Sequence, residues 1–186
     1  MGDRQNNCKG GVFRTAFAWF GCAMTHMMTT PDGSALSALC FGAMQFGGTA
    51  DAAASEGMYR ACRAAGINFF DTAWVYTQGE SERFLGRFIA AEREQIFVAS
   101  KVASEGGAGR ANILSQVDDS RKRLGIDRID AMYLHQFDRE TPLEESFETL
   151  AELHQAGVIG HIGVSNYAAW QVMKSVAITA RLGLTI

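Results

Sequence analysis

The chain has 186 residues, with 17 lysines and arginines against 20 aspartates and glutamates, so its formal net charge is −3. Because phosphate neutralisation needs a basic surplus, this balance argues against nucleic acid as a partner. Hydrophobic residues make up 47% of the chain, which indicates a packed core and argues against disorder. The four cysteines form no CxxC pair, so we expect neither a metal site nor a disulfide scaffold, and predict a reducing, cytoplasmic location.

No uninterrupted run of about 18 apolar residues exists, so no membrane span and no membrane partner is expected. The longest candidate, segment 12–28, imitates a signal peptide, but Arg14 and His26 interrupt it. The interruptions favour the alternative, in which these residues are a non-native extension and the natural protein starts near Met28. We therefore predict that residues 1–29 are a disordered or non-native extension and that residues 30–186 form one domain.

Short apolar runs alternate with amphipathic segments through the rest of the chain. The runs typical of strands are 39–44, 68–73, 96–102, 130–135 and 161–166, and 184–186 resemble the opening of another strand. The segments with helical spacing are 51–65, 81–91, 111–124, 143–155 and 168–182. The turn residues 31–34 are expected to join two short strands of a hairpin ahead of the first unit.

This alternation predicts parallel strands joined by right-handed crossover helices, in units of about 30 residues. Two architectures remain, a doubly wound sheet and a (β/α)₈ barrel. The fingerprint GxGxxG is absent: FGAMQFGG at 41–48 has the wrong spacing, and GGAG at 106–109 lacks the ending of a phosphate loop. Both segments are interpreted as turns, which favours the barrel.

In such a barrel the chemistry lies at the carboxyl ends of the strands. Polar residues end the predicted strands at Asp71, Lys101, His135, Ser165 and Asn166. A charge beside an apolar strand is costly unless it is paired, so five such endings on one rim indicate a site.

Four side chains on this rim suit proton transfer to a carbonyl oxygen. An ammonium from Lys101 beside the phenol of Tyr76 favours its anionic form, and the carboxylate of Asp71 holds that lysine. His135 can orient a carbonyl or relay a proton. Taken singly, Asp71 could cap a loop, Tyr76 could be a packed aromatic and His135 a plain rim histidine. Metal ligation by Asp71 and His135 is disfavoured because no second histidine or cysteine is placed to help.

The motifs around these residues resemble the aldo-keto reductase family. The segments that carry the resemblance are LCFGAMQFGG, FDTAWVYTQGESERFLG, FVASKV, YLHQFD and HIGVSNY. The resemblance as a whole covers about residues 30–186. The resemblance implies a (β/α)₈ barrel and NAD(P)H-dependent reduction of small-molecule aldehydes or ketones to alcohols. NADPH is the expected cofactor, with NADH as the alternative.

The resemblance also implies roles for the catalytic residues. Tyr76 would be the general acid, Lys101 and Asp71 would tune it, and His135 would help to bind the substrate carbonyl. Trp74 is expected to wall the substrate pocket, with core packing as the alternative.

The resemblance implies a cofactor site on the same rim. Ser165 and Asn166 would hydrogen-bond the nicotinamide carboxamide. Gly42 and Met44, after the first strand, would lie beside the cofactor together with Asp71.

The sequence departs from the family at its carboxyl end. Five units of about 30 residues make about 150, whereas a full barrel needs about 250 residues. The expectation is therefore a C-terminally truncated member whose incomplete barrel holds five units and the start of a sixth strand. A second hypothesis follows: a catalytically silent binding or assembly module that pairs its open barrel edges with itself or another chain.

Overall fold

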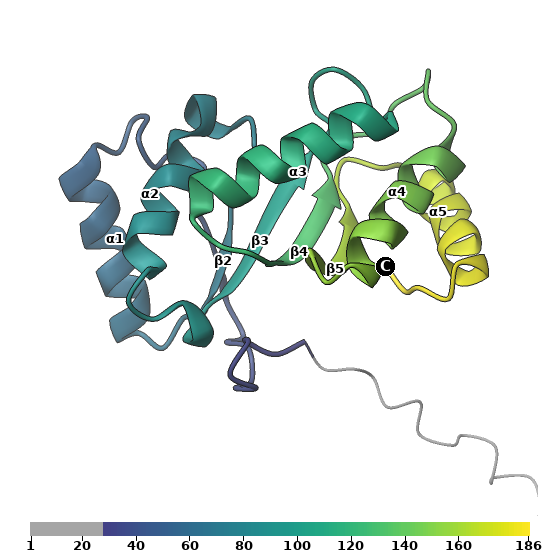
Figure 1. Ribbon diagram of the computed structural model, residues 1–186. Helices are drawn as coiled ribbons and strands as arrows, with labels where there is room; N and C mark the ends of the chain where they lie inside the picture. The colour runs from purple at the N-terminus through teal and green to yellow at the C-terminus, as the bar shows by residue number, and fades with distance from the viewer. Residues whose placement is uncertain (1–27) are drawn as a thin grey trace, which may run out of the picture.

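The computed structural model of the protein describes residues 28–186, so the predicted extension 1–29 lies almost wholly outside the described residues. Strands and helices alternate along the chain, as Figure 1 shows. The strands are β1 (Cys40–Gly42), β2 (Phe69–Asp71), β3 (Phe97–Val102), β4 (Ile129–Leu134) and β5 (Ile159–Val164). The helices are α1 (Ala52–Ala64), α2 (Glu80–Ile89), α3 (Arg110–Leu124), α4 (Leu143–Gln155) and α5 (Ala169–Arg181).

The five strands form one parallel sheet in the order β1-β2-β3-β4-β5. Each strand pairs with the next one along the chain, which is the arrangement that successive right-handed crossovers produce. The sheet does not close on itself within the described residues, so β1 and β5 are its edges. The predicted fold, an incomplete (β/α)₈ barrel, is confirmed.

Side chains alternate between the two faces of the sheet, as the strand period of two requires. The helix-facing side carries large apolar residues that pack against the helices, among them Phe70, Val98, Met132, Leu134 and Ile162. The opposite face, which is the inner face of a barrel, carries a smaller cluster of Phe97, Ala99 and Ala131 with Phe69 and Tyr133 against it. The sequence therefore places the main core between sheet and helices.

Two predicted features differ from the structure. Residues 184–186 form no strand, because a strand requires a neighbour to pair with and no described segment pairs with them. The predicted hairpin around 31–34 is reduced to one antiparallel bridge between Thr29 and Ala35. A backbone hydrogen bond from Thr30 to Ser34 holds the turn, and its Asp32 carboxylate accepts from the Thr30 hydroxyl and the Ser34 amide.

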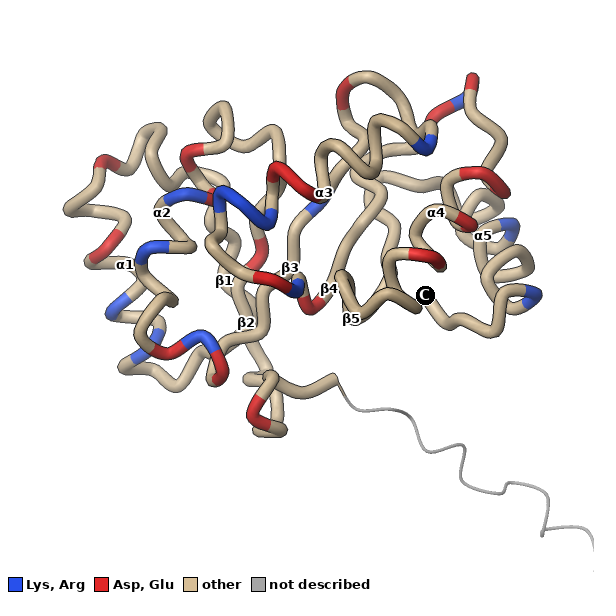
Figure 2. Tube along the Cα trace, viewed as in Figure 1, with Lys and Arg blue, Asp and Glu red and all other residues tan. Residues whose placement is uncertain are grey.

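Acidic and basic residues are interspersed over the helices and loops (Figure 2). Among the described residues no helix is both long enough and apolar enough to cross a membrane.

A close approach of α2 to α3 yields a stability prediction. A Cβ on Gly86 of α2 would lie 2.4 Å from the Leu124 carbonyl oxygen of α3, so Gly86→Ala must push two backbones apart. We expect a loss of about 1–3 kcal/mol in the free energy of unfolding. Gly57 of α1 is the matched control, since a Cβ there meets nothing within 4 Å. Gly57→Ala should stabilise by about 0.5–1 kcal/mol, and urea unfolding of both variants checks the pair.

Candidate active site

Parallel register brings the polar strand ends to one edge of the sheet. Asp71 is the last residue of β2, Lys101 is next to last in β3 and His135 directly follows β4. The Lys101 ammonium is buried and forms an ion pair with the Asp71 carboxylate. It also donates to the backbone carbonyl of Thr72 at 2.8 Å. These two contacts fix the ammonium at the edge.

Tyr76 reaches this pair from the loop between β2 and α2. Its hydroxyl lies 3.3 Å from the Lys101 Nζ, and the same nitrogen lies 4.8 Å from the centroid of its ring. The imidazole of His135 meets the Tyr76 ring edge-on, with centroids 5.6 Å apart and an interplanar angle of 82°. The structure therefore brings together Asp71, Tyr76, Lys101 and His135, the four residues that the sequence put forward as catalytic.

The surroundings of His135 favour the neutral form of its imidazole. Burial lowers the pKa of its imidazole from the ordinary 6.5, and the charge of Lys101 lowers it further, while Asp71 opposes this. The Nδ1 atom is buried with no hydrogen-bond partner among the described residues. A neutral imidazole of this kind can donate one hydrogen bond to a carbonyl oxygen without carrying charge.

A pH dependence of stability follows from His135. The imidazole of His135 binds a proton less readily in the folded chain than in the unfolded chain. Protonation of His135 therefore does not lower the free energy of unfolding above pH 6.5, and lowers it as the pH falls below that value. We expect the free energy of unfolding to fall between pH 7 and pH 5 by more in the parent than in His135→Gln. Urea unfolding at both pH values measures the fall in the parent and in the variant. Subtracting one from the other removes the contribution of the other titrating groups. An equal or larger fall in the variant would contradict the prediction.

The residues put forward for the cofactor lie along the same edge. Ser165 and Asn166 follow β5, and the Asn166 amide nitrogen donates to the His135 carbonyl at 2.8 Å. The Asn166 backbone is left-handed, with φ of 58°, which asparagine tolerates better than most residues. Gly42 and Met44 are exposed at the end of β1, and a Cβ on Gly42 would meet nothing within 4 Å.

This donor set is chemically suited to a carboxamide. With its nitrogen taken up by His135, Asn166 can turn its side-chain oxygen to a carboxamide N–H, and the Ser165 hydroxyl can donate to a carboxamide oxygen. The open space beside Gly42 leaves room for a flat ring against the backbone. The residues that are present therefore suit a nicotinamide.

Trp74 turns away from the other site residues toward α3. Its indole nitrogen donates to Asp119 at 3.4 Å, and its ring lies 5.0 Å from the Arg123 guanidinium carbon. It also packs against the main core, as the packing alternative expects, and its place in the wall of a substrate pocket stays a prediction.

Sequence reasoning did not single out Cys40, which begins β1 and pairs with Phe69, two residues before Asp71. Its thiol shares the inner face with Asp71, and burial raises its pKa to about 11, with the Asp71 charge adding to the effect and Lys101 opposing it. Strand alternation was the available signal, because Cys40 stands two positions before Gly42. Among the described residues no group of three or more histidine, cysteine or acidic side chains is placed to hold a metal ion.

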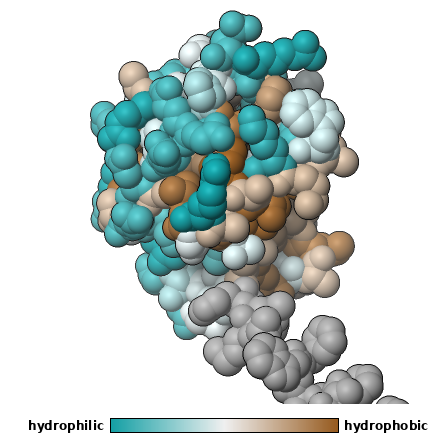
Figure 3. Space-filling view, turned by 90° about the vertical axis from the view of Figure 1, so that its right-hand side faces the viewer, coloured by the Kyte–Doolittle hydropathy of each residue, from teal (hydrophilic) through white to brown (hydrophobic). Residues whose placement is uncertain are grey.

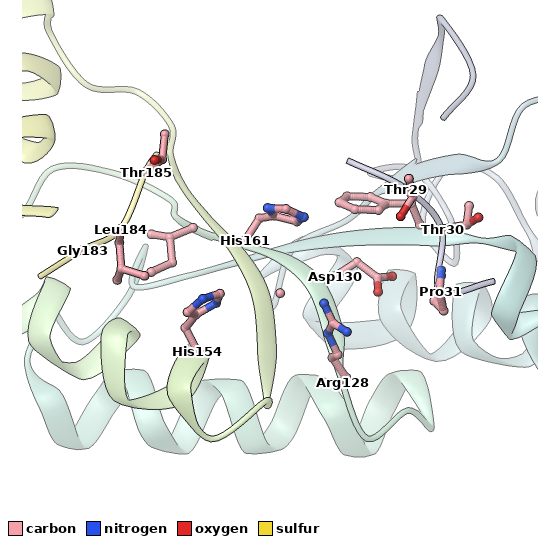
Figure 4. A pocket seen from close by; sticks show the side chains of 13 residues that line it. Thr29, Thr30, Pro31, Arg128, Asp130, His154, His161, Gly183, Leu184 and Thr185 are labelled. Carbon is pink, nitrogen blue, oxygen red and sulfur yellow. The ribbon is translucent and has the colours of Figure 1, made fainter. Parts of the chain in front are cut away.

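A cavity of about 550 Å³ lies at the other end of the sheet, between the amino ends of β3 to β5, the Thr29–Pro31 turn and the chain end (Figure 4). Its lining includes Arg128, His154 and His161 but none of the four clustered residues. Catalytic chemistry in parallel α/β barrels takes place at the carboxyl ends of strands, so this cavity is not the candidate active site.

Fold and site together define a parallel α/β barrel segment with an Asp–Tyr–Lys–His cluster at the carboxyl ends of its strands. The family model described as Aldo/keto reductase family matches residues 38–183. The chain belongs to this family.

Similar proteins include both enzymes and channel subunits. Aflatoxin B1 aldehyde reductase member 2 of Rattus norvegicus is 36% identical over 138 residues, which are 72% of this chain and 38% of that protein. A probable voltage-gated potassium channel subunit beta of Oryza sativa is 32% identical over 163 residues, 82% of this chain and 50% of that protein. A holo aldo-keto reductase of Bacillus halodurans superposes with a TM-score of 0.70 at 32% identity, covering 76% of this chain and 50% of that one. The chain thus spans half or less of the length of these relatives.

Proposed function

We propose that this chain supplies the proton-donating part of an NAD(P)H-dependent carbonyl reductase that converts small-molecule aldehydes or ketones to alcohols. The observation that carries the proposal is the Tyr76 hydroxyl, 3.3 Å from a buried ammonium that is itself paired with Asp71. Family membership supports an oxidoreductase, and the relative named an aldehyde reductase supports carbonyl chemistry.

Each residue of the cluster has a distinct task in this proposal. Tyr76 gives its hydroxyl proton to the carbonyl oxygen as negative charge develops there. Lys101 stabilises the phenolate that remains, since an ammonium at this distance favours the anionic form, and Asp71 keeps Lys101 in place. The neutral His135 donates a hydrogen bond that orients the carbonyl. A nicotinamide held by Ser165 and Asn166 would supply hydride to the carbonyl carbon.

NADPH is the preferred cofactor in this proposal, and NADH is the alternative. We place the nicotinamide end of the cofactor against Gly42, Met44, Asp71, Ser165 and Asn166. The proposed location is the cytoplasm.

A second function is favoured by the open sheet. Within residues 28–186, β1 and β5 each have no strand on one side, so the chain would act as a silent binding or assembly module that pairs these edges with itself or another chain. The relatives named as potassium channel subunits are consistent with an assembly role in this family.

Nucleotide titration separates the two functions. The fluorescence of NADPH and of NADH is followed as the chain is added, with Tyr76→Phe and the pair Ser165→Ala, Asn166→Ala as variants. The reductase proposal expects saturable binding that Tyr76→Phe retains and the paired variant weakens. Absence of binding to either nucleotide would favour the assembly module.

A further inference from the structure

A partly buried arginine outside the clustered residues contacts the loop that carries Tyr76. Arg123, in the last turn of α3, donates from its guanidinium to the backbone carbonyl of Trp74 at 2.8 Å. Its guanidinium atoms lie 2.7–2.8 Å from the point where a Cβ on Gly79 would stand, so a larger residue at position 79 would displace the guanidinium. One side chain thus touches the loop on both sides of Tyr76.

Glu82 anchors this arginine from α2. The Glu82 carboxylate is fully buried and accepts from Arg123 at 3.3 Å and from the Ser100 hydroxyl at 2.6 Å. Burial raises the pKa of Glu82, and the Ser100 hydrogen bond and the Arg123 charge oppose the rise. Ser100 directly precedes Lys101 in β3, so the same carboxylate ties the arginine to the strand that holds the ammonium.

The loop needs such an external hold because its backbone is strained. Thr77 and Gln78, the two residues after Tyr76, are left-handed with φ of 48° and 58°, and Gly79 follows with φ of 89°. Non-glycine residues in this conformation cost about 1–3 kcal/mol each and persist only where the surroundings over-determine them. On the other side of Tyr76, the Trp74 amide donates to the Lys101 carbonyl. The Thr77 hydroxyl also ties the turn to the Phe46 carbonyl and accepts from the Ser81 amide. Arg123 adds the hold from α3, and its loss removes the contact that joins the turn to that helix.

We propose that Arg123 is a positioning residue for the Tyr76 hydroxyl. Anchored by Glu82, it holds the Trp74 carbonyl and occupies the space beside Gly79, so that the loop presents the phenol to Lys101. The role of this placement in catalysis rests on the proposed function. The position of the Tyr76 ring can itself be measured without an activity assay.

The test compares the full chain with Glu82→Gln/Arg123→Met, which removes both charges so that no unpaired buried charge threatens folding. Hydrogen exchange is followed in the segment 74–81, and the ring ¹³C signal of Tyr76, assigned by its loss in Tyr76→Phe, is recorded at neutral pH. Losing a hydrogen bond from a charged donor should speed exchange in this segment by about tenfold or more. The Tyr76 signal should shift, because its ring moves relative to His135 and Lys101.

Tyr59 and Arg121 provide the controls. The Tyr59 ring packs against Phe70 and Phe88 and should keep its signal in the double variant. Arg121→Met removes an arginine two positions earlier in α3 that donates to the Asp127 carbonyl, and should leave the Tyr76 signal unchanged.

An unchanged Tyr76 signal, or equal changes at Tyr76 and Tyr59, would overturn the positioning role. If the expected changes appear but Tyr76→Phe retains turnover, the proton-donor assignment fails and the positioning role stands.

Discussion

Replacing Tyr76 by phenylalanine should lower carbonyl turnover about 10²–10⁴-fold, the usual contribution of a general acid. The measurement uses a barrel in which this chain is joined to the carboxyl half of a full-length relative. The substitution keeps the ring that packs against His135 and removes only the hydroxyl beside Lys101. NADPH affinity should hardly change, because the proposed cofactor contacts come from other residues.

Tyr133→Phe is the matched control for this substitution. Tyr133 lies in β4 and packs on the inner face of the sheet, and Lys101 donates no hydrogen bond to its hydroxyl. Its removal should leave turnover close to that of the parent barrel. Turnover retained in Tyr76→Phe, or lost equally in both variants, would remove Tyr76 from the mechanism.

The sequence predicts the regular elements well because their signals are local. Strand and helix limits fall within two or three residues of the structure, since glycines such as Gly66 and Gly125 end the helices with left-handed backbone. One exception is 184–186, whose apolar pattern predicts a strand. Pairing with a neighbour decides whether such a segment becomes one, and that neighbour is not local information.

The candidate site was predictable where a residue ends a strand. Asp71, Lys101 and His135 are placed by strand register alone, which the 30-residue repeat already predicts. Trp74 could not be placed in this way, because it lies in a loop whose direction is set by Arg123, distant in sequence. The strained turn after Tyr76 was equally hidden, since neither Thr77 nor Gln78 favours positive φ.

The chain by itself should self-associate and show little or no reductase activity. In the part of the chain that the structure describes, the edge strands β1 and β5 have no neighbouring strand on one side, and such an edge is a template for pairing with another chain. On α5, Trp170 and Met173 expose 62% and 66% of their surfaces. The side of the molecule toward α5 accordingly shows hydrophobic surface among hydrophilic side chains (Figure 3).

The energetic reason is the small margin of folded stability. Exposed apolar surface forfeits about 25 cal/mol per Å², and a domain is stable by only about 5–15 kcal/mol, so a few hundred Å² left open is a large share of that margin. Sedimentation velocity and an NADPH-coupled aldehyde assay on the same sample test the expectation. Met173→Lys shows which surface mediates the self-association. Association through α5 should weaken in this variant, whereas association through the strand edges should persist. A monodisperse monomer with ordinary turnover would contradict the prediction, because it would mean that five strands suffice for both stability and catalysis.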